Sequence, residues 1–310
     1  MSDVREVQLD LQQIVTELAD VRQRWRVSQH RSNEVGGREL PSGDALARIV
    51  NDLRGVLFPM RLGPADLRQE SEDFYVGFTL DSALQGLLEQ VRLELRYTHR
   101  LNPEADQVAI DQQAVQIVRD FGHALPEIRA LLDTDVVAAY RADPAALSVD
   151  EVLLCYPGIE AIIHHRLAHQ LYVSGAPLLA RWVAEIAHGK TGIDIHPGAH
   201  IGAGFFIDHG TGVVIGETAV IGKGVRIYQA VTLGAKSFPS DENGHAVKGL
   251  ARHPIVEDDV VIYAGATVLG RVTLGKGSSI GGNVWVTHDV APGAQVTQAR
   301  SQRDAETARQ

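Results

Sequence analysis

Histidine stands beside or close to a charged residue at three points in the second half of the chain: Asp194-Ile195-His196, Asp208-His209 and Arg252-His253. An imidazole titrates near physiological pH, so it can take a proton from a weak nucleophile. A carboxylate within reach can fix the tautomer of the ring and stabilise its charged form. Asp194 precedes His209 by fifteen residues. We interpret His209 as a general base and Asp194 as its supporting carboxylate.

A repeat of six residues is the element that must position these side chains. Thirteen aliphatic residues follow it, at positions 195, 201, 207, 215, 221, 227, 233, 256, 262, 268, 274, 280 and 286. Glycine follows six of these positions, which an amphipathic helix would not tolerate, and each short strand must be broken by a turn before the next aliphatic residue. The spacing predicts a hexapeptide-repeat parallel β-helix of about eighteen residues per coil.

The repeat is interrupted twice, and both interruptions carry a histidine. Two extra residues enter between Ile207 and Ile215, and seventeen enter between Leu233 and Val256. The second interruption predicts a loop over about residues 235–254 that leaves the coil. Since loops held on a rigid scaffold are where functional sites concentrate, we expect the site at these two places.

The residues around the interruptions resemble serine O-acetyltransferase, a family within the hexapeptide-repeat acyltransferases. The resemblance is carried by the sequences TGIDIHPGA (residues 191–199), FIDHGTGVVIGETA (residues 206–219) and Arg252-His253-Pro254. It extends upstream through Asp143-Pro144 to about residue 135. The family implies a left-handed β-helix and transfer of acetyl from acetyl-CoA to the hydroxyl of L-serine, the first step of cysteine biosynthesis. It also implies feedback inhibition by L-cysteine.

The resemblance implies a role for each matching residue. His209 and Asp194 correspond to the catalytic histidine and its orienting aspartate. The substrate-binding residues correspond to Asp143 and Asp208 on the ammonium side and to Arg252 and His253 on the carboxylate side, and the residues against acetyl-CoA correspond to Ala264 and Gly282. From the residues alone, Asp143 before a proline could also be a turn or helix-cap residue, and Arg252 could be a surface charge.

No metal is expected for this chemistry. His165 and His169 have the i, i+4 spacing of helical metal ligands, but with His164 they belong to a segment that we interpret as a packed helix. Four basic residues could meet the cofactor phosphates, although a solvated charge is the more common role for such residues: Lys236, Lys248, Arg271 and Lys276.

The pattern in residues 1–190 predicts an α-helical domain, and the resemblance implies that this domain joins subunits and supplies part of the serine site. Apolar residues recur at helical spacing in residues 7–26, 46–57, 82–97, 108–132 and 159–173, and Pro64, Pro103 and Pro126 predict breaks or kinks. The β-helix is expected over residues 191–296, followed by a polar tail at 297–310. We expect residues 1–38 to include a further helix that is disordered or bound to a partner.

Composition is typical of a cytoplasmic enzyme. The chain has 310 residues, a net charge of −10 and a pI near 5.7, which argues against broad nucleic-acid binding. It shows no signal peptide and no apolar run long enough to span a membrane. Cys155 is the only cysteine, which excludes an intrachain disulfide and fits a reducing compartment.

Two partners follow from the resemblance. The active sites of the family lie between subunits, so a homotrimer or a dimer of trimers is expected. Members that dock into O-acetylserine sulfhydrylase use a C-terminal isoleucine, whereas this chain ends in Arg309-Gln310, so we expect that contact to be absent or altered.

Two other functions stay open. An acyltransferase for a sugar or another amino acid would not need Asp143, Asp208 and Arg252 together, and an assembly scaffold would have no reason to carry His209.

Overall fold

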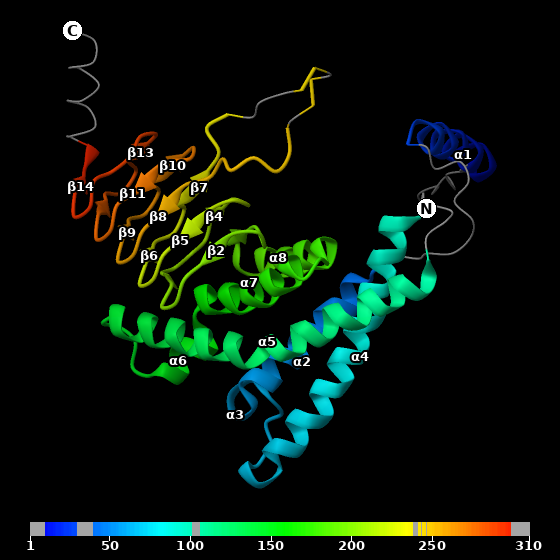
Figure 1. Ribbon diagram of the computed structural model, residues 1–310, viewed down its shortest axis with the longest axis horizontal. Coiled ribbons are helices and arrows are strands. Elements are labelled where there is room, and N and C mark those ends of the chain that lie inside the picture. Colours follow the sequence, from blue (N-terminus) through cyan, green and yellow to red (C-terminus); the bar gives the residue numbers. More distant parts are fainter. Residues whose placement is uncertain are drawn as a thin grey trace, which may run out of the picture. The chain divides into compact units, whose positions relative to one another are not determined.

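The chain forms two compact units, Met1–Glu39 and Leu40–Gln310. The computed structural model describes residues 10–29, 40–100, 106–237, 241–242, 244–245 and 247–298 (Figure 1). In the first unit the described element is α1 (Leu11–Ser28), which begins where the side chain of Asp10 accepts a hydrogen bond of 3.0 Å from the backbone N–H of Gln13.

The second unit begins with helices. They are α2 (Gly43–Leu57), α3 (Pro59–Leu62), the 3-10 helix η1 (Gln69–Ser71), α4 (Glu72–His99), α5 (Gln107–Ala142), α6 (Val149–Cys155), α7 (Pro157–Val173) and α8 (Pro177–Thr191). The predicted helical region is confirmed, and α5 continues through Pro126. Ser42, Asp106 and Ser148 cap α2, α5 and α6 with their side chains, and Gly192 ends α8 with a left-handed φ of 69°.

A left-handed parallel β-helix follows directly, which confirms the β-helix that the repeat predicts and the hand that the resemblance implies. Its strands are β1 (Asp194–Ile195), β2 (His200–Ile201), β3 (Phe206–Ile207), β4 (Val214–Ile215), β5 (Val220–Ile221), β6 (Arg226–Ile227), β7 (Thr232–Gly234), β8 (Ile255–Val256), β9 (Val261–Ile262), β10 (Thr267–Leu269), β11 (Thr273–Leu274), β12 (Ser279–Ile280), β13 (Trp285–Val286) and β14 (Gln295–Val296). They form three parallel sheets in the orders β1-β4-β7-β10-β13, β2-β5-β8-β11 and β3-β6-β9-β12-β14. Figure 1 shows the coils stacked one after another.

The repeat positions form the core of the coil. Twelve of the thirteen aliphatic residues are buried, and Ile201 is half-buried. Burial of an aliphatic side chain contributes about 1.5–3 kcal/mol, so stacked coils stabilise one another where a single coil could not fold. Regular pairing such as Val214 with Thr232 gives eighteen residues per coil.

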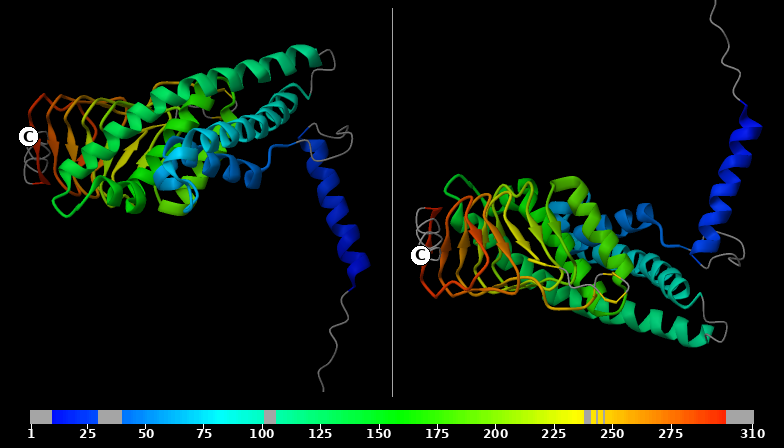
Figure 2. Two further views of the ribbon diagram at one scale, coloured as in Figure 1. Left: turned by 90° about the horizontal axis from the view of Figure 1, so that it is seen from below. Right: turned by 90° about the horizontal axis from the view of Figure 1, so that it is seen from above.

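A buried ion pair fastens the helices to the first coil. The guanidinium of Arg166 on α7 donates to the carboxylate of Asp135 on α5 at 2.7 and 2.9 Å, and also to the carbonyls of Ile201 and Gly202. Asp135 in turn accepts from the backbone N–H of Phe205 at 2.9 Å. Strands and helices therefore share one core, and α5, α7 and α8 lie at the β1–β3 end of the coil (Figure 2).

Three sequence expectations fall wholly or partly outside the described residues. The loop at 235–254 joins β7 to β8 and is described in part, while most of the tail, with the C-terminal contact, lies beyond Gln298. These expectations stay predictions. Among the described helices, none has both the length and the apolar character needed to cross a lipid bilayer.

Candidate active site

The predicted site residues lie mainly on two different edges of the three-sided coil. We call the stacked turns at residues 208–213, 228–231, 263–266 and 281–284 the His209 edge, because they join the third sheet to the first. The turns at residues 196–199 and 216–219, together with the return of the long loop at 252–254, form the Arg252 edge between the first and second sheets.

The extra residues of the first interruption change the turn that carries His209. Ordinary turns on this edge have one left-handed residue, such as Ala230 with φ 57° or Gly265 with φ 71°. Gly212 stacks on Ala230 and takes the same role, with φ 80°. His209 (φ 61°) and Gly210 (φ 92°) are therefore additional left-handed residues. A left-handed conformation is uncommon for a histidine, and the imidazole of His209 is 72% exposed at the edge.

Asp208 is nearly buried beside His209. Its carboxylate accepts a hydrogen bond of 2.5 Å from the guanidinium of Arg226, which also donates to the carbonyl of Ala142 at 2.8 Å. The other carboxylate oxygen lies 3.8 Å from Nε2 of His209. The Arg226 guanidinium also stacks over Phe206, which pairs with it across one coil. Asp208 is thus held on one side and available to His209 on the other.

Asp143 joins this cluster from the end of α5. Its carboxylate accepts from the hydroxyl of Tyr156 at 2.5 Å and from the backbone N–H of Ala145 at 2.8 Å. The Tyr156 hydrogen bond, then the Ala145 N–H, lowers the pKa of Asp143, and the nearby positive charges of Arg226 and His209 act in the same direction. The same hydrogen bond raises the pKa of Tyr156 to about 12. Asp143 is therefore an anion with one face fixed by protein donors.

Asp194 flanks the same turn on the coil before. Its backbone N–H donates to the carbonyl of Val213 at 2.9 Å, which ends the turn that Asp208 begins. Its carboxylate lies 3.8 Å from the guanidinium of Arg181 on α8. In the described part of the chain no ion pair joins His209 to Asp194. Asp194 is hydrogen-bonded to the end of the turn that carries His209, but the carboxylate of Asp194 lies near Arg181 and the imidazole of His209 near Asp208.

Thr218 organises the Arg252 edge. Its hydroxyl accepts from the backbone N–H groups of Arg252 at 2.9 Å and His253 at 3.1 Å. The same hydroxyl lies 2.9 Å from Nδ1 of His253, and the Thr218 backbone N–H donates to that nitrogen at 3.0 Å. Because Nδ1 accepts, the proton of the neutral ring is on Nε2.

His253 is buried and neutral. Burial, and next the charge of Arg252, lower the pKa of His253 to about 4. The edge of the ring lies over Gly216, where a Cβ atom would come within 2.0 Å of Cδ2. His253 therefore acts on its surroundings as an N–H donor and not as a positive charge.

Arg252 is paired within the chain. Its guanidinium donates to the carboxylate of Glu217 at 2.7 Å, and the Tyr172 hydroxyl donates to the other Glu217 oxygen at 3.2 Å. Burial alone would raise the pKa of Glu217, but these two hydrogen bonds outweigh it and the pKa is lowered. An anion that binds Arg252 shares the guanidinium with Glu217.

The two residues predicted against the cofactor lie on the His209 edge, in the turns two and three coils further on. Ala264 and Gly282 are adjacent, since a Cβ on Gly282 would lie 3.1 Å from the Ala264 carbonyl oxygen. Tyr263 beside them stacks on Tyr228 at 5.2 Å between ring centroids. The edge therefore carries two adjacent small, half-buried residues in the coils beyond His209.

The histidines of α7 pack in the interior. His164 and His165 are buried, and His169 donates from Nδ1 to the carbonyl of Pro197 at 2.8 Å. Burial lowers the pKa of all three. In the described residues, the three candidate metal ligands that lie within 4.8 Å of one another are instead Glu185, His188 and Asp194, and Arg181 is within 4.0 Å of both of these carboxylates.

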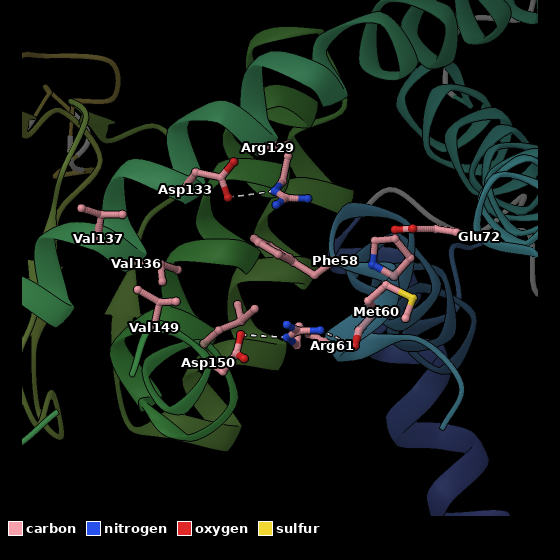
Figure 3. A pocket seen from close by; sticks show the side chains of 12 residues that line it. Phe58, Met60, Arg61, Glu72, Arg129, Asp133, Val136, Val137, Val149 and Asp150 are labelled. Carbon is pink, nitrogen blue, oxygen red and sulfur yellow. Dashed lines mark hydrogen bonds and ion pairs between the residues drawn. The ribbon is translucent and has the colours of Figure 1, made fainter. Parts of the chain in front are cut away.

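A cavity of about 500 Å³ lies away from both edges, between α3, α5 and α6 (Figure 3). Two ion pairs lie in its wall, with Arg61 donating to Asp150 at 2.7 Å and Arg129 to Asp133 at 3.0 Å. None of the predicted site residues lines it.

One chain thus brings together His209 and two carboxylates on one edge and an Arg–His pair on another. Sequence reasoning missed Arg226, Tyr156 and Thr218. Arg226 was detectable, because Phe206 and Arg226 directly precede the matching repeat positions Ile207 and Ile227, which places Arg226 one coil beyond the residue two positions before Asp208.

Comparison with known proteins agrees with the fold. Residues 253–288 match the bacterial transferase hexapeptide (six repeats) family. Over 267 residues the chain is 59% identical to a plasmid serine acetyltransferase of Synechococcus elongatus, covering 86% of this chain and 84% of that protein.

Solved structures give the same relationship. Serine acetyltransferase 1 of Entamoeba histolytica in complex with L-cysteine is 39% identical with a TM-score of 0.69, over 80% of this chain and 85% of that one. Serine acetyltransferase of Neisseria gonorrhoeae in complex with serine is 29% identical with a TM-score of 0.52, over 80% and 94%.

Proposed function

Because the chain belongs to the serine acetyltransferase family, we propose that it transfers acetyl from acetyl-CoA to the hydroxyl of L-serine, giving O-acetyl-L-serine and CoA as the first step of cysteine biosynthesis. The observation that carries the proposal is the identity of 59% over most of both chains. The cluster of a base and two carboxylates on the His209 edge supports it, because a zwitterionic alcohol needs an anionic site and a proton acceptor.

His209 is the proposed general base. Its exposed imidazole takes the proton of the serine hydroxyl while the oxygen attacks the thioester carbonyl. The new C–O bond forms, the tetrahedral intermediate loses the C–S bond, and the imidazolium returns its proton to the departing thiolate. Asp194 is proposed to support the imidazolium after a side-chain turn away from Arg181, since it flanks the same turn.

The ammonium group of serine is proposed to bind Asp143 and Asp208. Both carboxylates are held by neighbours and both lie close to His209. The serine carboxylate is proposed to bind Arg252, with the Nε2–H of His253 as a second donor.

A complete site then requires two subunits. The His209 edge and the Arg252 edge are different edges of one prism, with the first sheet between them. In a cyclic assembly the His209 edge of one chain meets the Arg252 edge of the next, which supports a homotrimer or a dimer of trimers. Acetyl-CoA is proposed to lie along the His209 edge against Ala264 and Gly282, where small residues allow a long pantetheine arm to approach.

Thiol release from acetyl-CoA tests the activity with L-serine, L-homoserine or an amino sugar as acceptor. We expect release with serine well above the rate of the other two, and background release with serine would refute the proposal. His209→Ala should lower kcat about 10²–10⁴-fold with the oligomer intact. His123→Ala, which removes an exposed histidine of α5, is the matched control and should keep full activity.

Mixed oligomers test the shared site. His209→Ala and Arg252→Ala chains are each expected to be nearly inactive alone. When the two kinds of chain co-assemble in equal amounts in a ring, about a quarter of the interfaces join an intact His209 edge to an intact Arg252 edge. About a quarter of the activity should therefore return. Sites made within one chain would give no recovery.

Two further properties are proposed. L-cysteine has the shape of serine and should compete with it, in line with the Entamoeba relative that was crystallised with L-cysteine. The single cysteine and the acidic composition of this chain favour a location in the cytoplasm.

A further inference from the structure

Helix α1 has an apolar stripe along one face. Leu11, Ile14, Leu18, Val21 and Trp25 follow one another at alternating steps of three and four residues. Each is between 43% and 65% exposed. The whole of α1 is described, and none of its residues is buried. A helix of this length is marginal in water by itself, so such a stripe indicates a face that becomes covered.

The spacing is that of a coiled-coil heptad. Leu11, Leu18 and Trp25 stand at a positions, and Ile14 and Val21 at d positions. The same register continues upstream in the sequence at Val4 and Val7, which lie outside the described residues. Leucine at a with β-branched residues at d favours more than two strands.

One charged pair that flanks the stripe fits a parallel arrangement. Glu17 is a g residue and Arg22 the e residue of the following heptad, so in a parallel coil Glu17 of one strand faces Arg22 of its neighbour. Val15 at the other described e position is 54% exposed and widens the apolar face beyond a and d. A wider face suits a helix that contacts two neighbours.

We propose that α1 packs against α1 of two further copies of this chain as a parallel three-stranded coiled coil. The apolar face of α1 is covered by the same face of the other copies, because the residues at a, d, e and g are complementary to themselves in both shape and charge. The number three also rests on the proposed function, since the divided active site requires a cyclic assembly; the heptad argument stands without it. The N-terminal segment is then an assembly element outside the acetyl-transfer site.

Disulfide trapping in the full-length chain tests this. Cys155 is replaced by serine, and Val21→Cys places a single thiol at a d position. In a parallel coil the Val21 positions of the strands meet at the axis, so mild oxidation should give disulfide-linked dimers. With three strands one thiol is left over, so cross-linking should stop at about two thirds of the chains.

The matched control is Gln23→Cys, two residues further on and on the opposite face of α1, which should form less than about a tenth as much dimer. Adding Leu18→Asp to the Val21→Cys chain should lower the cross-linking rate at least about tenfold, whereas Ala19→Asp, with the same charge on the far face, should not.

Three results would overturn the proposal: equal cross-linking at positions 21 and 23, a maleimide-reactive but uncross-linked Val21→Cys chain, or dimers that include nearly every chain, which means two strands. The readout uses no acetyl transfer. A chain that cross-links as expected but releases no thiol would therefore refute the proposed function and not the coiled coil.

Discussion

Removal of the Thr218 hydroxyl should weaken serine binding while leaving the fold and the acetyl-CoA side intact. The hydroxyl is the acceptor for two backbone N–H groups, of half-exposed Arg252 and buried His253, at 2.9 and 3.1 Å. Valine has nearly the same shape and no acceptor, so Thr218→Val leaves both donors without this partner. Thr218 is a positioning residue, because it acts through the Arg–His pair.

The expected size of the effect follows from those two donors. An unsatisfied buried N–H costs about 1–3 kcal/mol. We take about 1 kcal/mol for the half-exposed Arg252 N–H and about 2 kcal/mol for the His253 N–H, about 3 kcal/mol in all. At 1.4 kcal/mol per factor of ten, kcat/KM for serine should fall by up to about 100-fold. Thr218→Ser keeps the hydroxyl and should lose less than about threefold.

The assay is the initial rate of thiol release at varied serine and, separately, at varied acetyl-CoA. We expect the KM for serine to carry most of the loss, with kcat and the KM for acetyl-CoA changed less than about threefold, and circular dichroism to show a folded protein. A folded Thr218→Val chain whose kcat/KM for serine stays within about threefold of the parent would refute the reasoning.

Three other predictions concern single interactions. Tyr156→Phe removes the hydrogen bond that fixes Asp143 and should raise the KM for serine about tenfold in rate assays, with no change expected for acetyl-CoA; an unchanged value would show that Asp143 needs no support. His253 has a folded pKa of about 4 against about 6.5 when unfolded, so the unfolded state binds more protons between these values. Its share of the stability, about 3 kcal/mol, should be intact above pH 6.5 and lost as the pH falls towards 4. Urea unfolding at several pH values measures this, and a His253→Gln chain that falls equally steeply would contradict it. Asp135→Asn leaves Arg166 buried beside a neutral amide and should cost about 3–5 kcal/mol in the same assay, and a loss below about 1 kcal/mol would mean that water replaces the carboxylate.

The coil could be predicted from the sequence because its signal is local and repeated. Each aliphatic residue returns after six positions and its inward direction follows from that spacing alone. The same counting located the His209 turn, since two extra residues between Ile207 and Ile215 must distort one corner.

The side-chain networks could not be predicted in the same way, because they depend on which coils become neighbours. Thr218 and His253 are thirty-five residues apart, and they meet only because the seventeen-residue excursion leaves the stack at one corner and returns to it. Tyr156 reaches Asp143 through the packing of α6 against α5, for which the sequence carries no periodic signal. Likewise, the competing partners Arg181 and Glu217 are visible only in three dimensions.

The loop at 235–254 does not change the register in which the strands pair. Thr232 pairs with Thr267 across it, and Val220 pairs with Ile255, in the same register as coils that contain no insertion. Chain length at this corner is therefore independent of the hydrogen-bond pattern of the scaffold. A peptide of foreign sequence grafted between residues 241 and 245 would lengthen the loop that returns at the Arg252 edge without shifting the pairing of any strand. The length of this loop can therefore be varied while the rest of the molecule is kept constant.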